Sequence, residues 1–533
     1  MIRSLLISFL FITTILSCSQ PEESWVENII KSESEVLMVT SIDLMQLIEK
    51  VDLANNTKLS LDQKMMYKAF MSTFNSESLG FDVEKYHRLF VIPESGKLNA
   101  GIFLAGDITN KKNFEDFLIN YFGATSFTGT DLILCSIDEF NLQLGFNNEH
   151  FIAGISADNS YLESKINSLF NEDKLPSNDE NLNTYLSKRD DMNCYLSTEK
   201  LFGFLNDVNN PLVQSQLSKI NELKEFGSVI NLSMNFNDGN FTMKGNSNMS
   251  KTSNKTFYSS DGVDKKYQNF LTDNDELIMF AFLNMLPENL ISQMDQLSKL
   301  GVTNELNNVL YNMGTNTNEL LQILDGQMSF SLAGFPKSEN MSSNETGSST
   351  DSEDYWEDDE FDDLDYNNEV ASSSQENMPS VLISMGVKET DALISLLSKN
   401  NIEMINDEVL SIGMGINMLI KDNTFHISTN KKLIDKIKSN GELNSCSAVE
   451  GDYFDQPLYG FIDLDTHSWP EELLKELNQS SVGVNVLEYF ETVTITGSNN
   501  EAMFKIDFSN QNENSLKTII DLIISQRIIE NYI

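Results

Sequence analysis

Residues 36–43 read Val-Leu-Met-Val-Thr-Ser-Ile-Asp, and residues 44–51 read Leu-Met-Gln-Leu-Ile-Glu-Lys-Val. The first run is apolar and rich in β-branched residues, which predicts a buried β-strand that ends at Asp43. The second run has its apolar residues at helical spacing. This stretch therefore predicts a strand followed by a short helix, and the rest of the chain extends that pattern.

The second half of the chain repeats this order of elements. Asp275–Phe282 (DELIMFAF) matches the opening strand, and a helix is expected at Pro287–Met294. Gly386 lies between an expected strand and an expected helix, as Gly106 does in the first half. Because the two halves share little residue identity, chance agreement is the alternative to a duplication.

We therefore expect an α+β protein of two similar tandem units, each a mainly antiparallel sheet with helices packed on it. The first unit is expected over residues 32–253 and the second over residues 254–533. Short polar turns between expected strands predict the hairpins of an antiparallel sheet. These turns are Asn147-Asn148, Asn237-Asp238-Gly239-Asn240, Asp422-Asn423 and Asn499-Asn500.

One segment belongs to neither expected core. Residues 337–378 are rich in Ser, Asn, Asp and Glu, with no Lys or Arg between Ser338 and Met378. Such a run buries too little apolar surface to offset its chain entropy, so a disordered acidic loop is expected. It falls between two expected strands, which makes it an insertion in the second unit. Aromatic residues interrupt the acids and are candidate partner-docking residues: Tyr355, Trp356, Phe361 and Tyr366.

The same loop offers oxygen ligands for a cation. Asp363, Asp365 and Asn367 occupy the first three ligand positions of an EF-hand loop. However, Asn368 replaces the required glycine and Ser374 replaces the bidentate glutamate. We expect diffuse, weak cation binding at most and no resident cofactor or metal.

The N-terminus predicts export and a lipid anchor. Arg3 precedes a short apolar run from Leu5 to Leu16, which is typical of a signal peptide over residues 1–17. Ile15-Leu16-Ser17-Cys18 resembles a bacterial lipobox, in which Cys18 is lipidated and becomes the new N-terminus. An ordinary signal peptide that ends near a cysteine is the alternative.

Residues 18–31 are expected to form a tether. Glu22 and Glu23 follow the cysteine closely and resemble a surface-export signal of Bacteroidetes lipoproteins; a plain solvated linker is the alternative. Several acyl chains anchor a protein stably. We expect an outer membrane lipoprotein that faces either the periplasm or the exterior.

The amino-acid composition narrows the classes of partner that the protein can bind. The formal net charge is −44 and the pI is near 4.3. This field repels phosphate backbones, so nucleic acid is excluded as a partner, and anionic membrane surfaces are disfavoured. An envelope protein or polymer remains as the expected partner class, together with the membrane that holds the lipid.

No catalytic motif is present. We find no GxSxG, no phosphate-binding GxxxxGK[ST], no HExxH and no GxGxxG after a strand. The four histidines, at positions 87, 150, 426 and 467, are separate in sequence and are expected to be structural. Cys135, Cys194 and Cys446 are far apart and have no metal-ligand spacing, so buried free thiols are expected, with a disulfide as the alternative.

The densest polar and aromatic cluster outside the loop is Phe461–Pro470 (FIDLDTHSWP). It contains Asp463, Asp465, His467 and Trp469. A strand end that runs into a helix cap explains it, and a functional site is the alternative.

The lipobox, the opening SESEVLMVTSIDLMQLIEKVDL and the doubled strand–helix layout together resemble a family. The chain looks like the uncharacterised Bacteroidetes lipoproteins of domain-of-unknown-function family 4836. The resemblance covers most of the mature chain and implies no catalytic residues, because that family carries no assigned activity.

Two functional hypotheses follow. We favour a lipid-anchored cell-envelope protein that binds or scaffolds without catalysis. The alternative is an envelope hydrolase built from dispersed carboxylates, since glycoside hydrolysis needs only two of them. A pocket with two facing carboxylates would favour the enzyme, and a flat or grooved surface would favour binding.

Overall fold

The computed structural model describes residues 24–137, 141–171, 179–208, 228–248, 256–270, 277–289, 317–334, 379–399, 416–439, 455–466 and 484–525, with a few shorter stretches between them. The leader, Cys18, Cys446, His467, the acidic loop over residues 337–378 and its candidate docking residues Tyr355, Trp356, Phe361 and Tyr366 lie outside the described residues.

The chain forms two compact units. Unit 1 comprises Met1–Asn237, Met243–Ser250 and Asn514–Ile533, and unit 2 comprises Asp238–Thr242 and Lys251–Glu513. The expected boundary at residues 253 and 254 therefore misplaces the C-terminal segment. Helix α19 (Ser515–Ser525) contacts α3 and β8 of unit 1, and Asn56 donates a hydrogen bond to Asp521.

Unit 1 combines one sheet with helices, as expected for an α+β fold. Its strands are β1 (Met38–Ile42), β2 (His87–Pro93), β3 (Ala100–Asp107), β4 (Ile133–Ile137), β5 (Leu142–Phe146), β6 (His150–Ile155), β7 (Met192–Ser197) and β8 (Val229–Asn237), with β9 (Asn240–Ser247) divided between the units. Its helices are α2 (Trp25–Ser32), α3 (Leu44–Val51), η1 (Leu53–Asn55), α4 (Leu61–Thr73), α5 (Ser76–Leu79), α6 (Lys111–Phe122), α7 (Asn159–Asn171), α8 (Glu180–Leu186), α9 (Thr198–Asp207) and α19.

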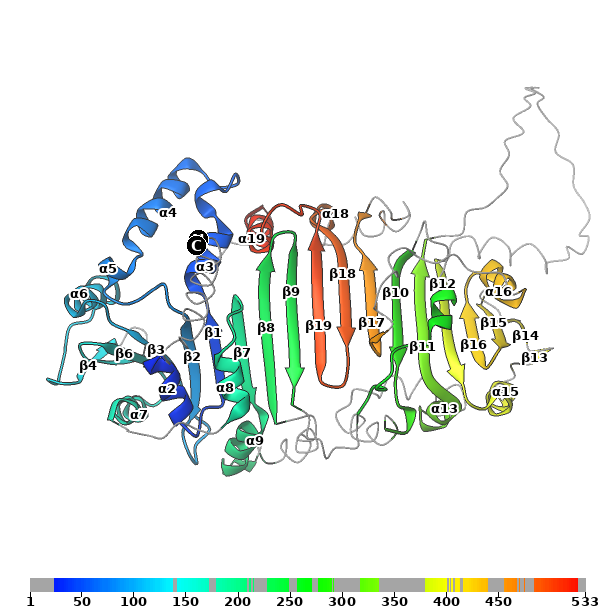
Figure 1. Ribbon diagram of the computed structural model, residues 1–533, viewed down its shortest axis with the longest axis horizontal. Helices are drawn as coiled ribbons and strands as arrows, with labels where there is room; N and C mark the ends of the chain where they lie inside the picture. The colour runs from blue at the N-terminus through cyan, green and yellow to red at the C-terminus, as the bar shows by residue number, and fades with distance from the viewer. Residues whose placement is uncertain are drawn as a thin grey trace, which may run out of the picture. The chain divides into compact units, whose positions relative to one another are not determined.

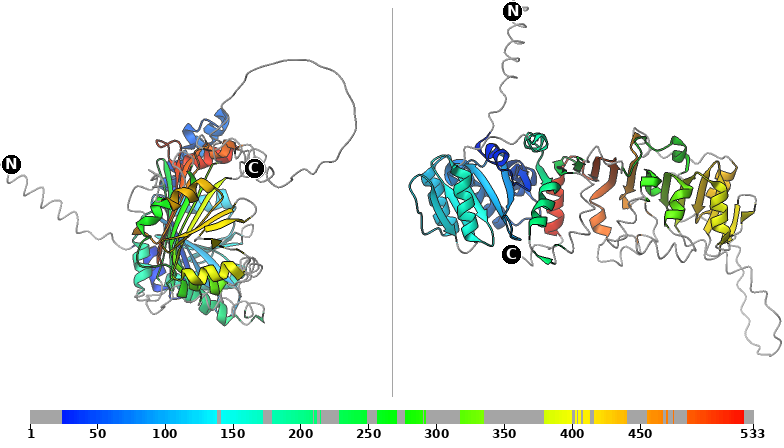
Figure 2. Two further views of the ribbon diagram at one scale, coloured as in Figure 1. Left: turned by 90° about the vertical axis from the view of Figure 1, so that its right-hand side faces the viewer. Right: turned by 90° about the horizontal axis from the view of Figure 1, so that it is seen from below.

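The strands of unit 1 lie in the order β4-β5-β6-β3-β2-β1-β7-β8, and all of these pairs are antiparallel (Figure 1). The opening strand is thus central, as its apolar sequence predicts. Helices α2, α7 and α8 supply core residues that pack on one face of the sheet (Figure 2). The mainly antiparallel sheet with packed helices is confirmed for this unit.

The expected tether at residues 18–31 ends sooner than the sequence indicates. Ser24 caps helix α2, and Val26, Ile29 and Ile30 of that helix are buried in the core of unit 1. The polar residues before Trp25 obscured a short helix whose apolar side chains recur every three to four positions.

Unit 2 is also an antiparallel α+β unit. Its strands are β10 (Leu277–Asn284), β11 (Leu324–Ala333), β12 (Ser380–Val387), β13 (Met404–Ile405), β14 (Glu408–Ile412), β15 (Ile416–Lys421), β16 (Thr424–Ser428), β17 (Leu458–Asp463), β18 (Phe490–Gly497) and β19 (Glu501–Phe508). Its described helices are η4 (Lys265–Phe270), α13 (Thr317–Ile323), α15 (Thr390–Lys399), α16 (Lys431–Lys438) and α18 (Val484–Leu487). The strand order is β13-β14-β15-β16-β12-β11-β10-β17-β18-β19.

The expected hairpin turns are confirmed. Residues 147–149 connect β5 to β6, and Asp238-Gly239 connects β8 to β9. Asp422 and Asn423 both have positive φ, 49° and 55°, which is the backbone of a type I′ turn. Residues 498–500 connect β18 to β19.

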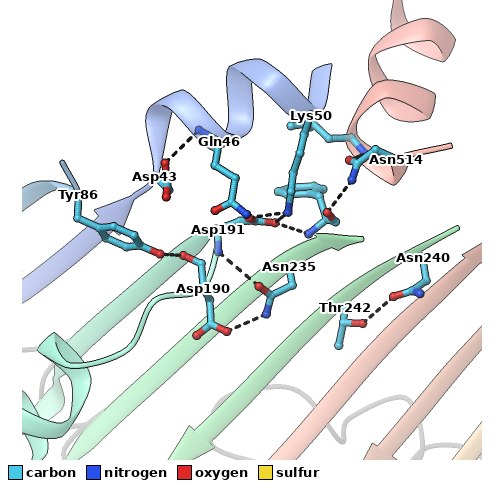
Figure 3. A network of polar contacts seen from close by, with 12 residues as sticks. Asp43, Gln46, Lys50, Tyr86, Asp190, Asp191, Asn235, Asn240, Thr242 and Asn514 are labelled. Carbon is cyan, nitrogen blue, oxygen red and sulfur yellow. Dashed lines mark hydrogen bonds and ion pairs between the residues drawn. The ribbon is translucent and has the colours of Figure 1, made fainter. Parts of the chain in front are cut away.

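A buried carboxylate joins three elements of unit 1. Lys50 of α3 donates to Asp191 at 2.7 Å, and the backbone amide of Phe236 in β8 donates to the same carboxylate at 2.6 Å. Asn235 bridges Asp190 and the backbone of Asp191 (Figure 3). These bonds fix α3 and β8 against the start of β7.

Unit 2 contains a buried histidine in its sheet. Ser384 and His426 are cross-strand partners, and the Ser384 hydroxyl lies 2.9 Å from the His426 Nδ1. His426 is 1% exposed. Burial, reinforced by Lys421 and Lys266, lowers the pKa of His426 from its ordinary 6.5 to about 4.

We predict that this histidine makes the sheet of unit 2 sensitive to acid. The unfolded chain takes up a proton near pH 6.5 and the folded chain only near pH 4, so stability falls as the pH drops through this window. The loss should reach about 3 kcal/mol. Hydrogen exchange of β12 and β16, corrected for intrinsic rates, measures it. His426→Gln should remove most of the pH dependence, and an unchanged dependence would contradict the assignment.

Candidate functional site

The two faces of the sheet in unit 1 differ in how they are covered. Val39, Phe90, Phe103 and Tyr195 are fully buried and share the face that α2, α7 and α8 cover. Because side chains alternate along a strand, the neighbouring residues point to the opposite face. Most of those neighbours are also apolar, with Thr40 as an exception.

A continuous row of apolar side chains crosses the opposite face. Paired positions in successive strands are, in order, Ile230, Leu196, Met38, Val91, Ile102 and Ile155. With strands about 4.8 Å apart, these six positions span roughly 24 Å. Ile102 is 51% exposed and Ile155 is 48% exposed, so the described chain leaves the β3–β6 end of this row open to solvent.

Helix α6 covers only the far end of this face. Phe114 and Leu118 of α6 pack with Leu144 and Phe151 of the β5–β6 hairpin. Towards the centre of the sheet, Leu89 is 36% exposed. We call the uncovered part the open face, defined by seven residues: Met38, Leu89, Val91, Ile102, Ile155, Leu196 and Ile230.

An uncovered apolar face of this kind is a candidate interaction surface. Single exposed apolar residues are common, but contiguous exposed patches mark contacts with proteins, ligands or membranes. The residues come from six adjacent strands, so the surface is held rigidly by the ladder and needs no reorganisation to bind.

A second feature of unit 1 is a polar pocket of about 190 Å³ near the start of α2 and the ends of β2 and β3. We call it the ion-pair pocket. Its lining is Ser24, Val26, Glu27, Asp82, Lys85, Tyr86, His87, Arg88, Ala105, Gly106, Asp107 and Arg189.

Glu27 accepts two guanidinium groups in this pocket. Its Oε1 lies 2.5 Å from Arg88 and 3.3 Å from Arg189. Arg88 is 2% exposed and also donates to the Leu186 carbonyl, yet its buried Nε has no hydrogen-bond partner. Burial lowers the pKa of Arg88, and Glu27 opposes that effect. Arg189 lies over the Tyr86 ring at 5.1 Å.

Asp107 is held between a histidine ring and a lysine. His150 Nδ1 lies 2.9 Å from its carboxylate, and Lys85 Nζ lies 2.7 Å from it. These bonds, with that of His150 the largest cause, lower the pKa of Asp107, and Asp107 in turn raises the pKa of Lys85. The His150 ring stacks on Trp25 at 4.1 Å.

These contacts suit binding better than acid–base catalysis. A glycosidase needs one carboxyl group with a raised pKa as the acid. Asp107 has a lowered pKa, and Glu27 is committed to two arginines. Burial lowers the pKa of His87, whose ring contacts the Val83 carbonyl. The pocket holds three carboxylates and three Lys or Arg cations, which balance.

The histidines predicted to be structural have partners where they are described, namely His87, His150 and His426. Cys135 and Cys194 are free thiols. In the FIDLDTHSWP cluster, Trp469 donates to the Asp463 carbonyl at 2.9 Å at the end of β17. This is the local strand-end geometry that we expect. Among described residues, no group of acidic, histidine and cysteine side chains is arranged to hold a metal ion.

The sequence analysis missed both features of unit 1. The open face had a signal: Val36–Ile42 and His87–Pro93 are nearly continuous apolar runs, whereas a strand with one solvated face alternates. The ion-pair pocket had no signal in the sequence, because Glu27, Arg88 and Arg189 are far apart along the chain.

Within the described part of the chain, no helix has both the length and the apolar character needed to cross a bilayer.

Comparisons with known proteins do not assign this chain to a family. No family model and no curated protein matches the chain. Among solved structures, crystal form I of TP0453 is similar at 9% identity over 42% of this chain and 79% of that chain, with a TM-score of 0.23. Crystal form III gives 9% identity over 43% and 81%, with a TM-score of 0.24. Scores this low do not establish a shared fold.

We predict that two substitutions in the ion-pair pocket differ in how much they lower the stability of unit 1. Glu27→Ala leaves the buried Arg88 without a counter-charge and should destabilise unit 1 by about 3–5 kcal/mol. Arg189→Ala should cost less than about 1 kcal/mol, because its side chain is 48% exposed. Urea unfolding followed by tryptophan fluorescence measures both. Equal costs would show that Glu27 does not serve the buried arginine.

Proposed function

We propose that this protein is a lipid-anchored component of the cell envelope that binds a partner through the open face of unit 1 and does not catalyse a reaction. The observation that carries the proposal is the row of apolar side chains on the open face, in which Ile102 and Ile155 are the most exposed. The partner is an envelope protein with a complementary apolar surface, which would cover this row as a second layer covers a sheet.

The flat surface favours a protein partner over a small substrate. Small-molecule sites are concave and enclose most of the ligand, whereas the open face is a pleated surface of six strands. An apolar surface of this kind gains free energy from burial at about 25 cal/mol per Å².

Hydrolysis is the weaker alternative. It needs a carboxylic acid that stays protonated near neutral pH. In the ion-pair pocket Glu27, Asp82 and Asp107 each lie within ion-pairing distance of a basic side chain. Cations stabilise the charged form of a carboxylate, so this pocket supports binding of a polar ligand better than proton transfer.

The anchor is the second part of the proposal. Ile15-Leu16-Ser17-Cys18 supports lipidation at Cys18, and the lipid would hold the protein on the outer membrane, facing the periplasm or the exterior. Membership of domain-of-unknown-function family 4836 stays a proposal that rests on the opening sequence and the layout of elements.

We further propose that the two units arose by tandem duplication. When the strands of each unit are counted in chain order and the two-residue β13 is left out, both sheets run fourth, fifth, sixth, third, second, first, seventh, eighth. Agreement over eight strands supports common descent more strongly than Gly106 and Gly386 do. An experimental structure with different strand orders in the two units would refute it.

The acidic loop at residues 337–378 is proposed as a second docking segment, with Tyr355, Trp356, Phe361 and Tyr366 as anchors and weak cation binding by its carboxylates. Aromatic residues carry much of the energy where segments dock.

The anchor makes a direct prediction. Cys18→Ser should abolish incorporation of radiolabelled palmitate and leave the leader uncleaved or release the protein from membranes. Cys194→Ser is the matched control, because Cys194 is a free, half-buried thiol of unit 1 and its loss should leave labelling unchanged. Normal processing and membrane retention of Cys18→Ser would rule out the lipid anchor.

The open face makes another prediction. Ile102→Thr with Ile155→Thr keeps β-propensity and removes apolar surface, so the melting temperature should change little. A photo-crosslinking amino acid at position 102 should crosslink to an envelope protein in cells, and one at position 119 on α6 should not.

The double variant should lower both bis-ANS fluorescence and the crosslink yield from a neighbouring open-face position, 91, several-fold. Ile119→Gln with Tyr121→Gln, two residues that are 45% and 60% exposed, is the control and should retain both signals. Undiminished crosslinking by the Ile102 and Ile155 variant would show that binding occurs elsewhere.

A further inference from the structure

Helix α4 of unit 1 is exposed along its whole length. None of its 13 residues is buried. Leu61 and Met66 are each 73% exposed, Met65 is 54% exposed and Phe70 is 52% exposed. In Figure 1, α4 lies beyond the strand ends of its own unit, and it packs on the short helix η1.

Local sequence specifies this helix despite its exposure. Ser60 and Gln63 form a reciprocal capping box, in which the Ser60 hydroxyl accepts from the Gln63 amide at 3.2 Å and the Gln63 side chain accepts from the Ser60 amide at 2.9 Å. Isolated helices of this length are marginal in water, so a surface that covers α4 would stabilise it.

The large exposed residues gather on one half of the helix. At about 100° per residue, Leu61, Met65, Met66 and Phe70 fall within one half-turn. Tyr67 and Met71 fall in the other half and are half-buried. The outward half of α4 therefore carries the four large apolar side chains together with Ala69, Ser72 and Thr73, and Asp62 is its only charged residue.

The charge of this segment differs from that of the chain. Residues 57–75 contain Lys58, Lys64 and Lys68 against Asp62, a net charge of +2, whereas the whole chain carries −44. The sequence of α4 and its flanks thus carries a charge opposite to that of the whole chain. Lysines at the border of an apolar face can reach lipid headgroups while their stems stay in the interface.

We propose that α4 lies in the headgroup region of a phospholipid membrane, with Leu61, Met65, Met66 and Phe70 inserted. The reach of the chain fits, and here the inference rests on the lipid anchor proposed above. Residues 18–24 extend over roughly 20 Å at most, so a lipid on Cys18 keeps unit 1 at the membrane surface. Several acyl chains already hold the protein at the membrane, and α4 would add a second contact with the same surface.

A second copy of the chain is a poorer occupant. A helix of 13 residues is about 20 Å long and about 10 Å wide, so one face offers a few hundred Å². A stable interface buries about 800 Å² on each partner. The surplus negative charge of the chain also opposes contact between copies.

The test uses the chain from residue 19 onward, which keeps every described element and lacks the lipid. It is floated with vesicles of phosphatidylethanolamine and a minority of phosphatidylglycerol. We expect Met66→Gln with Phe70→Gln to lower the partition coefficient at least tenfold, since two large side chains lose their burial in the interface. Glutamine keeps helix propensity, so circular dichroism should be unchanged. Ile119→Gln with Tyr121→Gln should float like the unsubstituted chain.

Each outcome decides the proposal. If the unsubstituted chain does not float, or the α4 variant floats equally well, α4 is not a membrane contact. If sedimentation velocity instead shows a dimer that the α4 variant abolishes, the occupant is a second copy and the proposal is overturned. Flotation that depends on α4 stands even if Cys18→Ser in cells shows no lipid anchor, so the two hypotheses fail separately.

Discussion

The fold of unit 1 depends on the hydrogen-bonded pairing of β1 with its two neighbouring strands. This five-residue strand pairs over its whole length with β2 on one side and β7 on the other. A slip of one residue would exchange the faces of the sheet, placing Val39 in solvent and Met38 in the core. Tyr185 of α8 helps to fix the register, because its hydroxyl lies 2.9 Å from the Val39 carbonyl and 3.0 Å from the Ser41 hydroxyl.

Fixing that register determines both surfaces of the sheet at once. The face of Val39, Phe90 and Phe103 receives α2, α7 and α8. Of the helices that the structure describes, α6 packs on one end of the other face, so the same strand that builds the core also presents Met38 on the open face. The candidate site is therefore a consequence of how the helices are distributed over a sheet that is apolar on both sides.

The sequence predicts the order of elements well because hairpin turns and strand periodicity are local. Asp422-Asn423 adopts the positive φ angles that its residue types favour, and α4 begins one residue after Ser60 as capping chemistry requires. Contacts between elements that are distant in sequence cannot be predicted in this way. Helix α2 is too short for a clear periodic signal, and the C-terminal α19 joins unit 1 through contacts some 460 residues apart, as in the bond from Asn56 to Asp521.

The candidate sites illustrate the same limit of local information. Arg88 follows the apolar pattern of a core position in β2 and is buried there, which is possible because Glu27 arrives from α2. No spacing in the sequence relates these two residues. The apolar runs of β1 and β2 did signal burial on two faces, but only the structure tells which face the described helices leave partly uncovered.

Net charge opposes the association between copies that exposed apolar surfaces would favour. Uncovered sheet faces and exposed apolar helices favour association between copies. Two copies that approach carry 44 surplus negative charges each, and their repulsion acts over about 8 Å at physiological ionic strength. A neutral or basic partner meets no such barrier. The acidic composition therefore opposes self-association through the open face, and it does not oppose the approach of a neutral or basic molecule.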